Sequence, residues 1–291
     1  MPRRPGPSAR SRRLAQTLRK IRAEKGVSAA EVGKELGMSG SKINRIETCE
    51  IGIYLDDLEK LLDFHQVTQQ RRVELLDIAR HAEQRSWLRT RNAHFPADWQ
   101  TWSDFEDEAT GLRYYDPMVI PGLLQTSEYA RAVIAGTSDG LSVDQIEERV
   151  ASRTARRALL SRPEPLHLHV LIEEAALARP FGDRGCLVRQ LHHLAEEASR
   201  PNVTVQIVPT SAGLHPGAAG AFIIVEYDGE LSLIWLELIA SSLILEEDEQ
   251  LDAYRLAWEK LSGCALAPDE SVAQLRQMAV QAEQGSDMLR T

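Results

Sequence analysis

The sequence predicts a mainly α N-terminal domain followed by an α+β domain with a largely antiparallel sheet. Apolar residues recur at helical spacing in four short segments between residues 13 and 64, whereas runs typical of strands occur only after residue 165. Charge is divided in the same way: residues 1–90 hold 18 Lys and Arg against 12 Asp and Glu, and the remaining 201 residues hold 16 against 31. A basic end joined to an acidic remainder is typical of a small nucleic-acid-binding module fused to a second domain.

Four short helices are expected in the N-terminal domain. Gly26 and Gly37 stand where the first two helices should end, because glycine readily adopts the left-handed conformation of a helix C-terminus. Ser28 with Glu31 forms a capping-box pattern that opens the second helix, and Ser39 is a natural cap for the third. The apolar positions of the four helices are Leu14, Leu18 and Ile21; Val32 and Leu36; Ile43 and Ile46; and Leu55, Leu58, Leu61 and Leu62.

The segment GKELGMSGSKINRIE, residues 33–47, has the pattern of a helix-turn-helix, whose second helix can enter the major groove of DNA. Ile43 and Ile46 are expected to face inward. Arg45 can donate two hydrogen bonds to guanine, and Asn44 is suited to adenine. The residues expected to point outward are Gly40, Ser41, Lys42, Asn44 and Arg45.

Phosphate contacts are expected from the helix ends and from the N-terminal arm. Ser28 and Ser39 mark helix N-termini, whose free N–H groups attract phosphates. Arg12 and Arg13 could follow the DNA backbone or enter a minor groove. An ordinary solvated basic surface is the alternative interpretation of these charges.

The segment LRKIRAEKGVSAAEVGKELGMSGSKINRIE resembles the Cro/repressor-like helix-turn-helix regulators, the XRE family, over residues 13–66. The resemblance implies binding to double-stranded DNA and a structural ion pair between Arg22 and Glu47. Ala29 stands where this family often has a glutamine, which gives more weight to the third helix and the arm. Because one small motif reads few base pairs, we expect a homodimer that reads two half-sites about one helical turn apart.

The second domain mixes helices with clustered strands. FPADWQTWSDFEDEA is an acidic amphipathic helix, and YYDPMVIPGLLQT is extended and interrupted by two prolines. Strands are expected in LHLHVLIEE, VTVQIVP, AFIIVEY and LSLIWLEL, with a hairpin at Asp228 and Gly229. Further helices are expected near residues 127–135, 143–160, 186–199, 248–261 and 271–283.

The segments VIPGLLQTSEYARAVIAG, RVASRTARRALL, LHVLIEEAAL, VRQLHHLAE, RPNVTVQIVP and GAFIIVEY occur in this order. Over residues 95–280 they resemble a domain of unassigned function that follows this helix-turn-helix in many bacterial regulators. Members are described as antitoxin-like and related to the Scr-type systems, and are commonly encoded beside a small partner protein. The resemblance implies a transcriptional regulator whose second domain receives a partner protein or ligand, and we expect the same domain to dimerise. An antitoxin-like protein that holds a small partner, and binds DNA for autoregulation, is the alternative.

Catalysis is not expected of the second domain. Glu173 and Glu174 are adjacent near a strand end, so they should point to opposite faces rather than act as a paired acid and base. His192 and His193 are neighbours on a helix and do not share a face. We therefore expect no enzyme activity.

No cofactor or metal is expected either. His167 and His169 share one face of a strand, but no third ligand stands at a supporting spacing. The Gly-rich loop 211–221 lacks the lysine of a phosphate-binding loop. The sequence leaves open whether these two histidines or this loop bind anything.

Four arginines lie along one helix: Arg149, Arg153, Arg156 and Arg157. They could bind an acidic partner, nucleic acid or the acidic helices of their own domain. The last interpretation is favoured, because the domain is net negative.

The domains are therefore assigned as a flexible basic arm (1–12), the helix-turn-helix domain (13–66), a helical connector (67–94), the α+β domain (95–284) and a tail (285–291). No apolar run approaches the roughly 18 residues that a membrane helix needs. The three cysteines are scattered, which suits a reducing compartment. A cytoplasmic protein without a membrane segment is expected.

Overall fold

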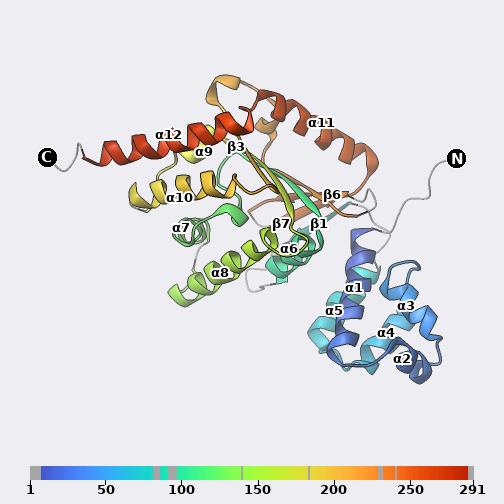
Figure 1. Cartoon of the computed structure of the whole chain (residues 1–291). Helices are drawn as coiled ribbons and strands as arrows, with labels where there is room; N and C mark the ends of the chain where they lie inside the picture. The colour runs from blue at the N-terminus through green and yellow to red at the C-terminus, as the bar shows by residue number, and fades with distance from the viewer. Residues whose placement is uncertain are drawn as a thin grey trace. The chain divides into compact units, whose positions relative to one another are not determined.

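The computed structural model describes residues 8–80, 86–90, 97–138, 140–182, 184–228, 232–239 and 241–287. The chain divides into two compact units, one formed by Met1–Trp87 with Leu245–Glu247 and the other by Leu88–Ile244 with Asp248–Thr291. Figure 1 shows the helical N-terminal unit in blue and the α+β unit in green to red. The predicted fold class is confirmed for both.

Helix α2 and the start of α3 lie where the capping residues predict. Ser28 and Ser39 cap α2 and α3, and Gly37 ends α2 with a left-handed φ of 67°. The first helix begins earlier than expected, because Ser8 caps it through the N–H of Ser11. Residues 9–12, which the sequence assigns to a flexible arm, are therefore helical, while residues 1–7 lie outside the described residues. The helices are α1 (Ala9–Glu24), α2 (Ala29–Leu36), α3 (Gly40–Glu47), α4 (Leu55–Phe64) and α5 (Gln69–Arg80).

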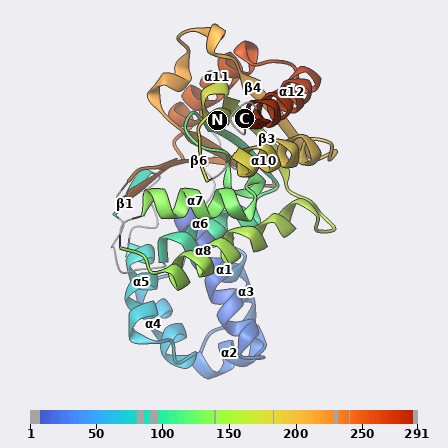
Figure 2. The same cartoon turned by 90° about the vertical axis from the view of Figure 1, so that its left-hand side faces the viewer.

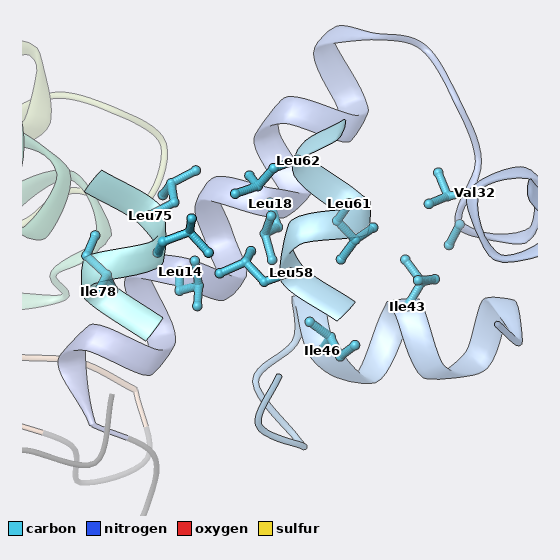
Figure 3. Packing of buried hydrophobic residues seen from close by; sticks show 12 residues of the cluster. Leu14, Leu18, Val32, Ile43, Ile46, Leu58, Leu61, Leu62, Leu75 and Ile78 are labelled. Atoms are coloured by element: carbon cyan, nitrogen blue, oxygen red, sulfur yellow. The ribbon is translucent and has the colours of Figure 1, made fainter. Parts of the chain in front are cut away.

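A single apolar core holds these helices together. Figure 3 shows Leu14 and Leu18 of α1 in the same cluster as Leu58 of α4 and Leu75 and Ile78 of α5. Helix α5 falls in the segment that the sequence assigns to a connector, but its buried leucines and isoleucine belong to this core. The helical domain therefore extends to the end of α5, and residues 81–85 and 91–94 of the expected connector lie outside the described residues.

The C-terminal unit is built on one mixed sheet. Among the described residues it has seven strands in the order β1-β7-β6-β5-β2-β3-β4. Strand β5 pairs antiparallel with β2 and β6, and Leu238 N–H donates to Ser241 O across the turn that joins β6 to β7. Strand β3 pairs parallel with β2 and β4 at the other edge. The strands are β1 (Ser86–Thr90), β2 (Gly111–Asp116), β3 (His167–Glu173), β4 (Val203–Val208), β5 (Phe222–Glu226), β6 (Ser232–Glu237) and β7 (Ser241–Leu245).

Helices cover both faces of this sheet. On one face Trp235 of β6 packs against Trp102, with ring centroids 5.0 Å apart. On the other face Phe222 of β5 packs against Tyr254 and Trp258. Figures 1 and 2 both show α10 and α12 side by side. The helices are α6 (Ala97–Glu108), α7 (Ser127–Thr137), α8 (Val143–Ala155), α9 (Glu174–Leu177), α10 (Arg184–Glu197), α11 (Asp248–Cys264) and α12 (Pro268–Asp287), with single-turn helices η1 (Gly122–Leu124), η2 (Arg156–Leu160), η3 (Thr210–Ala212) and η4 (Pro216–Ala219).

The sheet and the C-terminal end differ from the expectation. Strands β1, β2 and β7 were not predicted: β1 lies in the segment that the sequence assigns to a helical connector, and β2 lies within the sheet, between β5 and β3. Helix α12 extends to Asp287, into the expected tail, whose residues 288–291 lie outside the described residues.

Within the part of the chain that the structure describes, no helix is both long and apolar enough to span a bilayer.

Candidate nucleic-acid interface

Helices α2 and α3 are joined by a tight turn that depends on two close backbone contacts. Met38 N–H donates to Gly33 O at 2.7 Å. An ideal Cβ at Gly33 would lie 2.7 Å from Met38 O, and one at Gly40 would lie 2.9 Å from Ala30 Cα. Any larger residue at either position would push the two helices apart. Gly40 therefore faces α2, and the expectation that it points outward from α3 is corrected.

One face of α3 is exposed and polar. Ser41, Asn44, Arg45 and Thr48 are exposed and lie at positions i, i+3, i+4 and i+7, so they form one continuous row. Ile43 is buried on the opposite face, with only 1% of its surface exposed. The helix thus presents hydrogen-bonding side chains on one face and anchors itself by the other.

Lys42 does not belong to this row. Its Nζ lies 2.6 Å from Asp57 Oδ2, so the side chain ties α3 to α4. The ammonium group has three N–H donors, and an ion pair with one carboxylate oxygen leaves donors for a phosphate. Lys42 therefore lies at the edge of the row, with its ammonium group paired to α4.

The two serine caps differ in whether the N-terminus of their helix is open to a phosphate or already faces a carboxylate. Ser28 N–H donates to Glu31 Oε2 at 2.7 Å, and Glu31 N–H donates to Ser28 Oγ at 3.2 Å. The hydrogen bond from Ser28 N–H lowers the pKa of Glu31, so a carboxylate occupies the place that a phosphate would take. Ser28 is corrected to a structural cap. Ser39 accepts from Lys42 N–H at 3.0 Å, and the first turn of α3 has no acidic residue.

Arg12 and Arg13 are not arranged as an extended arm. Both lie in the first turns of α1, where the side chain of Arg12 is 15% exposed and Arg13 is 5% exposed. Because α1 begins at Ala9, the expectation that these two arginines follow the DNA backbone is corrected. Arg19 and Lys20 are the exposed basic residues further along the same helix.

Arg22 and Glu47 form the ion pair that fixes α3 against α1. Arg22 Nε lies 2.8 Å from Glu47 Oε1, Nη2 lies 2.7 Å from Oε2, and Nη1 donates to Val27 O at 2.9 Å. This pair positions α3 and is not available to DNA, because Glu47 is buried.

A buried histidine lies beside this pair. His65 is 3% exposed, and burial lowers its pKa, with Lys25 and Arg22 acting in the same direction and Glu47 opposing them. The imidazole therefore favours its neutral form in the folded domain.

Two exposed residues of this unit were not identified from the sequence. Thr48 extends the row by one turn, and its spacing of seven from Ser41 was the available signal. Tyr54 is 79% exposed at the start of α4, the helix that follows α3 in the chain. No local pattern singled out this tyrosine.

In the C-terminal domain, the expected carboxylates have separate partners. Glu173 Oε1 accepts from Tyr115 Oη at 2.8 Å and lies 3.2 Å from His215 Nε2. Glu174 Oε2 accepts from Thr210 N–H at 2.9 Å. Both carboxylates thereby hold the segment that follows β4.

The histidines are likewise dispersed. His169 Nε2 lies 2.7 Å from Gln206 Oε1 and its ring packs on Trp258, whereas His167 is exposed. His192 lies near Glu283, and His193 near Glu197. In the described ranges no three His, Cys, Asp or Glu side chains are arranged to hold a metal ion.

The Gly-rich loop 211–221 packs on the sheet. A Cβ at Gly217 would overlap the phenol group of Tyr115, and Gly213 and Gly220 have φ of 72° and 124°. His215 connects the loop to Glu173.

The arginines of α8 and η2 bond within their own domain. Arg156 Nε lies 2.6 Å from the buried carboxylate of Glu106, and Arg157 pairs with Glu197. Arg153 Nη1 donates to Gln125 Oε1 at 2.9 Å. The interpretation in which these arginines serve their own domain is supported for these three.

Comparison with known families agrees with this division of the chain. Residues 13–75 match a helix-turn-helix domain, which indicates a DNA-binding regulator. A comparison with curated proteins gave no match. Residues 99–277, more than half of the chain, match the family described as Domain of unknown function (DUF5753). The chain therefore belongs to the DUF5753 family and carries a helix-turn-helix domain ahead of the family's defining domain.

Proposed function

We propose that this protein is a sequence-specific transcriptional regulator that reads double-stranded DNA with α3 in the major groove. The exposed row of Ser41, Asn44, Arg45 and Thr48 is the observation that carries the proposal. Arg45 is the guanine reader and Asn44 the adenine reader, each worth about 1–3 kcal/mol of discrimination.

Phosphate contacts position this row. The N-terminus of α3 has a serine cap and no acidic residue in its first turn, so its N–H groups favour an anion. Lys42, paired with Asp57, holds this end of the helix against α4. These contacts set the register on DNA, and the row reads the bases.

A row of four side chains reads few base pairs, so the regulator acts as a homodimer on two half-sites about one helical turn apart. A DNA-binding regulator works in the cytoplasm, where the DNA of a bacterial cell lies.

The test is binding of the purified full chain to a pool of random duplexes, with sequencing of the retained molecules, followed by fluorescence anisotropy on the best sequence. The proposal expects an enriched site with a repeated half-site and a marked preference over scrambled DNA at moderate salt. Retention without an enriched site would overturn it, because phosphate contacts alone give only weak, salt-sensitive binding.

We further infer that the C-terminal domain acts by binding a partner protein or ligand, not by catalysis. Its side chains support this: Glu173 and Glu174 are each engaged in holding a loop, and two aliphatic side chains are almost fully exposed, Leu214 at 97% and Ile239 at 98%. Both lie in connections at the end of the sheet where β2 and β3 finish, because β6 runs in the same direction as β2.

In the antitoxin-like alternative, the main task of the protein is to hold a small partner protein, and DNA binding serves to regulate its own expression. Co-expression with the product of a small gene adjacent to its own, which the family resemblance implies, tests it. A complex of fixed stoichiometry that Leu214→Asp weakens would favour the partner-binding domain, and failure to co-purify would oppose it.

A further inference from the structure

We propose that Glu50 is a positioning residue for Arg45, which aims the guanidinium at guanine and suppresses binding to other DNA. The proposal rests on the proposed function, because it names the regulation of specificity within the same recognition face.

The backbone at the end of α3 brings the two side chains together. Cys49 N–H donates to Ile46 O at 3.1 Å, and Glu50 N–H donates to Arg45 O at 2.9 Å. Cys49 is left-handed, with φ of 57°. These are the two hydrogen bonds and the left-handed residue of a Schellman motif, in which the second residue past the cap lies beside the third residue from the end of the helix. Those two positions usually carry an apolar contact, and here they carry Glu50 and Arg45.

The side chains complete the arrangement. Glu50 Oε2 lies 3.5 Å from Arg45 Nε, and Glu50 Oε1 accepts from Thr48 Oγ1 at 3.1 Å. Thr48 thus orients the carboxylate, and the carboxylate faces the inner nitrogen of the guanidinium. The contact is made by Nε, and not by the two terminal nitrogens that form the fork for guanine O6 and N7.

The charge of Glu50 explains why the pair would favour the correct site. Arg45 alone would bind any phosphate, whereas Arg45 with Glu50 has no net charge and gains little from a phosphate. Both side chains are more than half exposed, so the pair contributes little to folding. An acidic residue on a DNA-binding face lowers the affinity for DNA, because the carboxylate repels phosphates. At the correct sequence the contact between Arg45 and a base offsets this loss. At incorrect sequences Arg45 makes no such contact, so the affinity for them stays low.

The experiment compares binding of the full chain to its selected site and to scrambled DNA over a salt series. The variants are wild type, Glu50→Gln, Arg45→Ala and the double variant. Glu24→Gln is the matched control, because it removes an exposed carboxylate at the end of α1. Thermal unfolding verifies that each variant is folded.

Glu50→Gln is expected to bind scrambled DNA more tightly, with a salt slope steeper by about one, since one more phosphate contact becomes favourable. Its preference for the selected site should fall about fivefold, the lower end of what a bidentate base contact provides. In the Arg45→Ala background the same substitution should leave the preference unchanged.

The proposal is overturned if Glu50→Gln changes the preference no more than Glu24→Gln does, or changes it equally without Arg45. If Arg45→Ala itself leaves the preference intact, the assignment of α3 as the base reader fails instead, and the role of Glu50 fails with it. If wild type shows no preference at all, both are overturned.

Discussion

Gly33→Ala should weaken the helix-turn-helix, although alanine is the better helix former. An ideal Cβ at Gly33 lies 2.7 Å from Met38 O and 2.9 Å from Gly40 N. Both are backbone atoms of the turn, so no side chain can rotate away. Overpacking of this kind costs about 1–3 kcal/mol, and the helix propensity of alanine returns up to about 1 kcal/mol. The net loss should be about 1–2 kcal/mol, which makes opening of the domain about 5–30 times more frequent.

Amide hydrogen exchange of peptides from α2 and α3 in the full chain measures this opening directly. Tryptophan fluorescence does not serve here, because the first tryptophan of the chain is Trp87, beyond α5. The control is Gly263→Ala in α11, where an ideal Cβ meets no described atom within 4 Å. That variant should raise the opening free energy of its own helix by up to about 1 kcal/mol, and amide exchange in α11 should slow accordingly. If Gly33→Ala leaves exchange in α2 and α3 unchanged or slows it, the close packing inferred for the turn is refuted.

Three further predictions concern the same unit. Cys49→Gly should be about 1 kcal/mol more stable than Cys49→Ala, because the residue has a left-handed φ that glycine adopts without strain; equal exchange rates in the two variants would contradict this. Glu47→Gln should destabilise the unit by about 2 kcal/mol, since it removes the charge that pairs with Arg22, and an unchanged opening free energy would show that the pair is dispensable. Burial lowers the pKa of His65, so its contribution to stability should be present above the unfolded pKa, about 6.5, and be lost as pH falls below it. Between pH 7.5 and 5.5 the unit should therefore lose stability, and His65→Gln should show a smaller loss over that interval; an equal loss would exclude His65 as the cause.

The N-terminal helices were predictable because their ends are encoded locally. Ser28, Gly37 and Ser39 each act within one turn of their own position, so short-range rules place α2 and α3. The core role of α5 was less evident, because Leu75 and Ile78 find their partners only when α5 folds back onto α1.

Strand β2 was not predicted, for a related reason. The segment GLRYYD is short and has no clear alternation of apolar and polar residues, with Arg113 and Tyr114 half-buried in its middle. Its position within the sheet depends on partners far away in sequence, such as His169 opposite Arg113 and Ile223 opposite Tyr114. The pattern of apolar and polar residues within the segment does not reveal those pairings.

The site shows the same division between local and tertiary information. Helical periodicity placed Ser41, Asn44 and Arg45 on one face of α3. It could not show that Asp57, from α4, holds Lys42. Glu50 was missed because its importance arises from the left-handed turn after α3, and that turn is formed by a cysteine in a position where glycine is the usual signal.

The most direct test of the account is the affinity of the full chain for its own upstream DNA and for scrambled DNA across a salt series, measured for wild type and for Arg45→Ala. Wild type should prefer the upstream region, and Arg45→Ala should lose most of that preference while its salt slope on scrambled DNA stays nearly unchanged, since Arg45 paired with Glu50 makes no phosphate contact there. If both proteins bind the two DNAs equally and lose binding steeply with salt, α3 does not read bases and the account is contradicted.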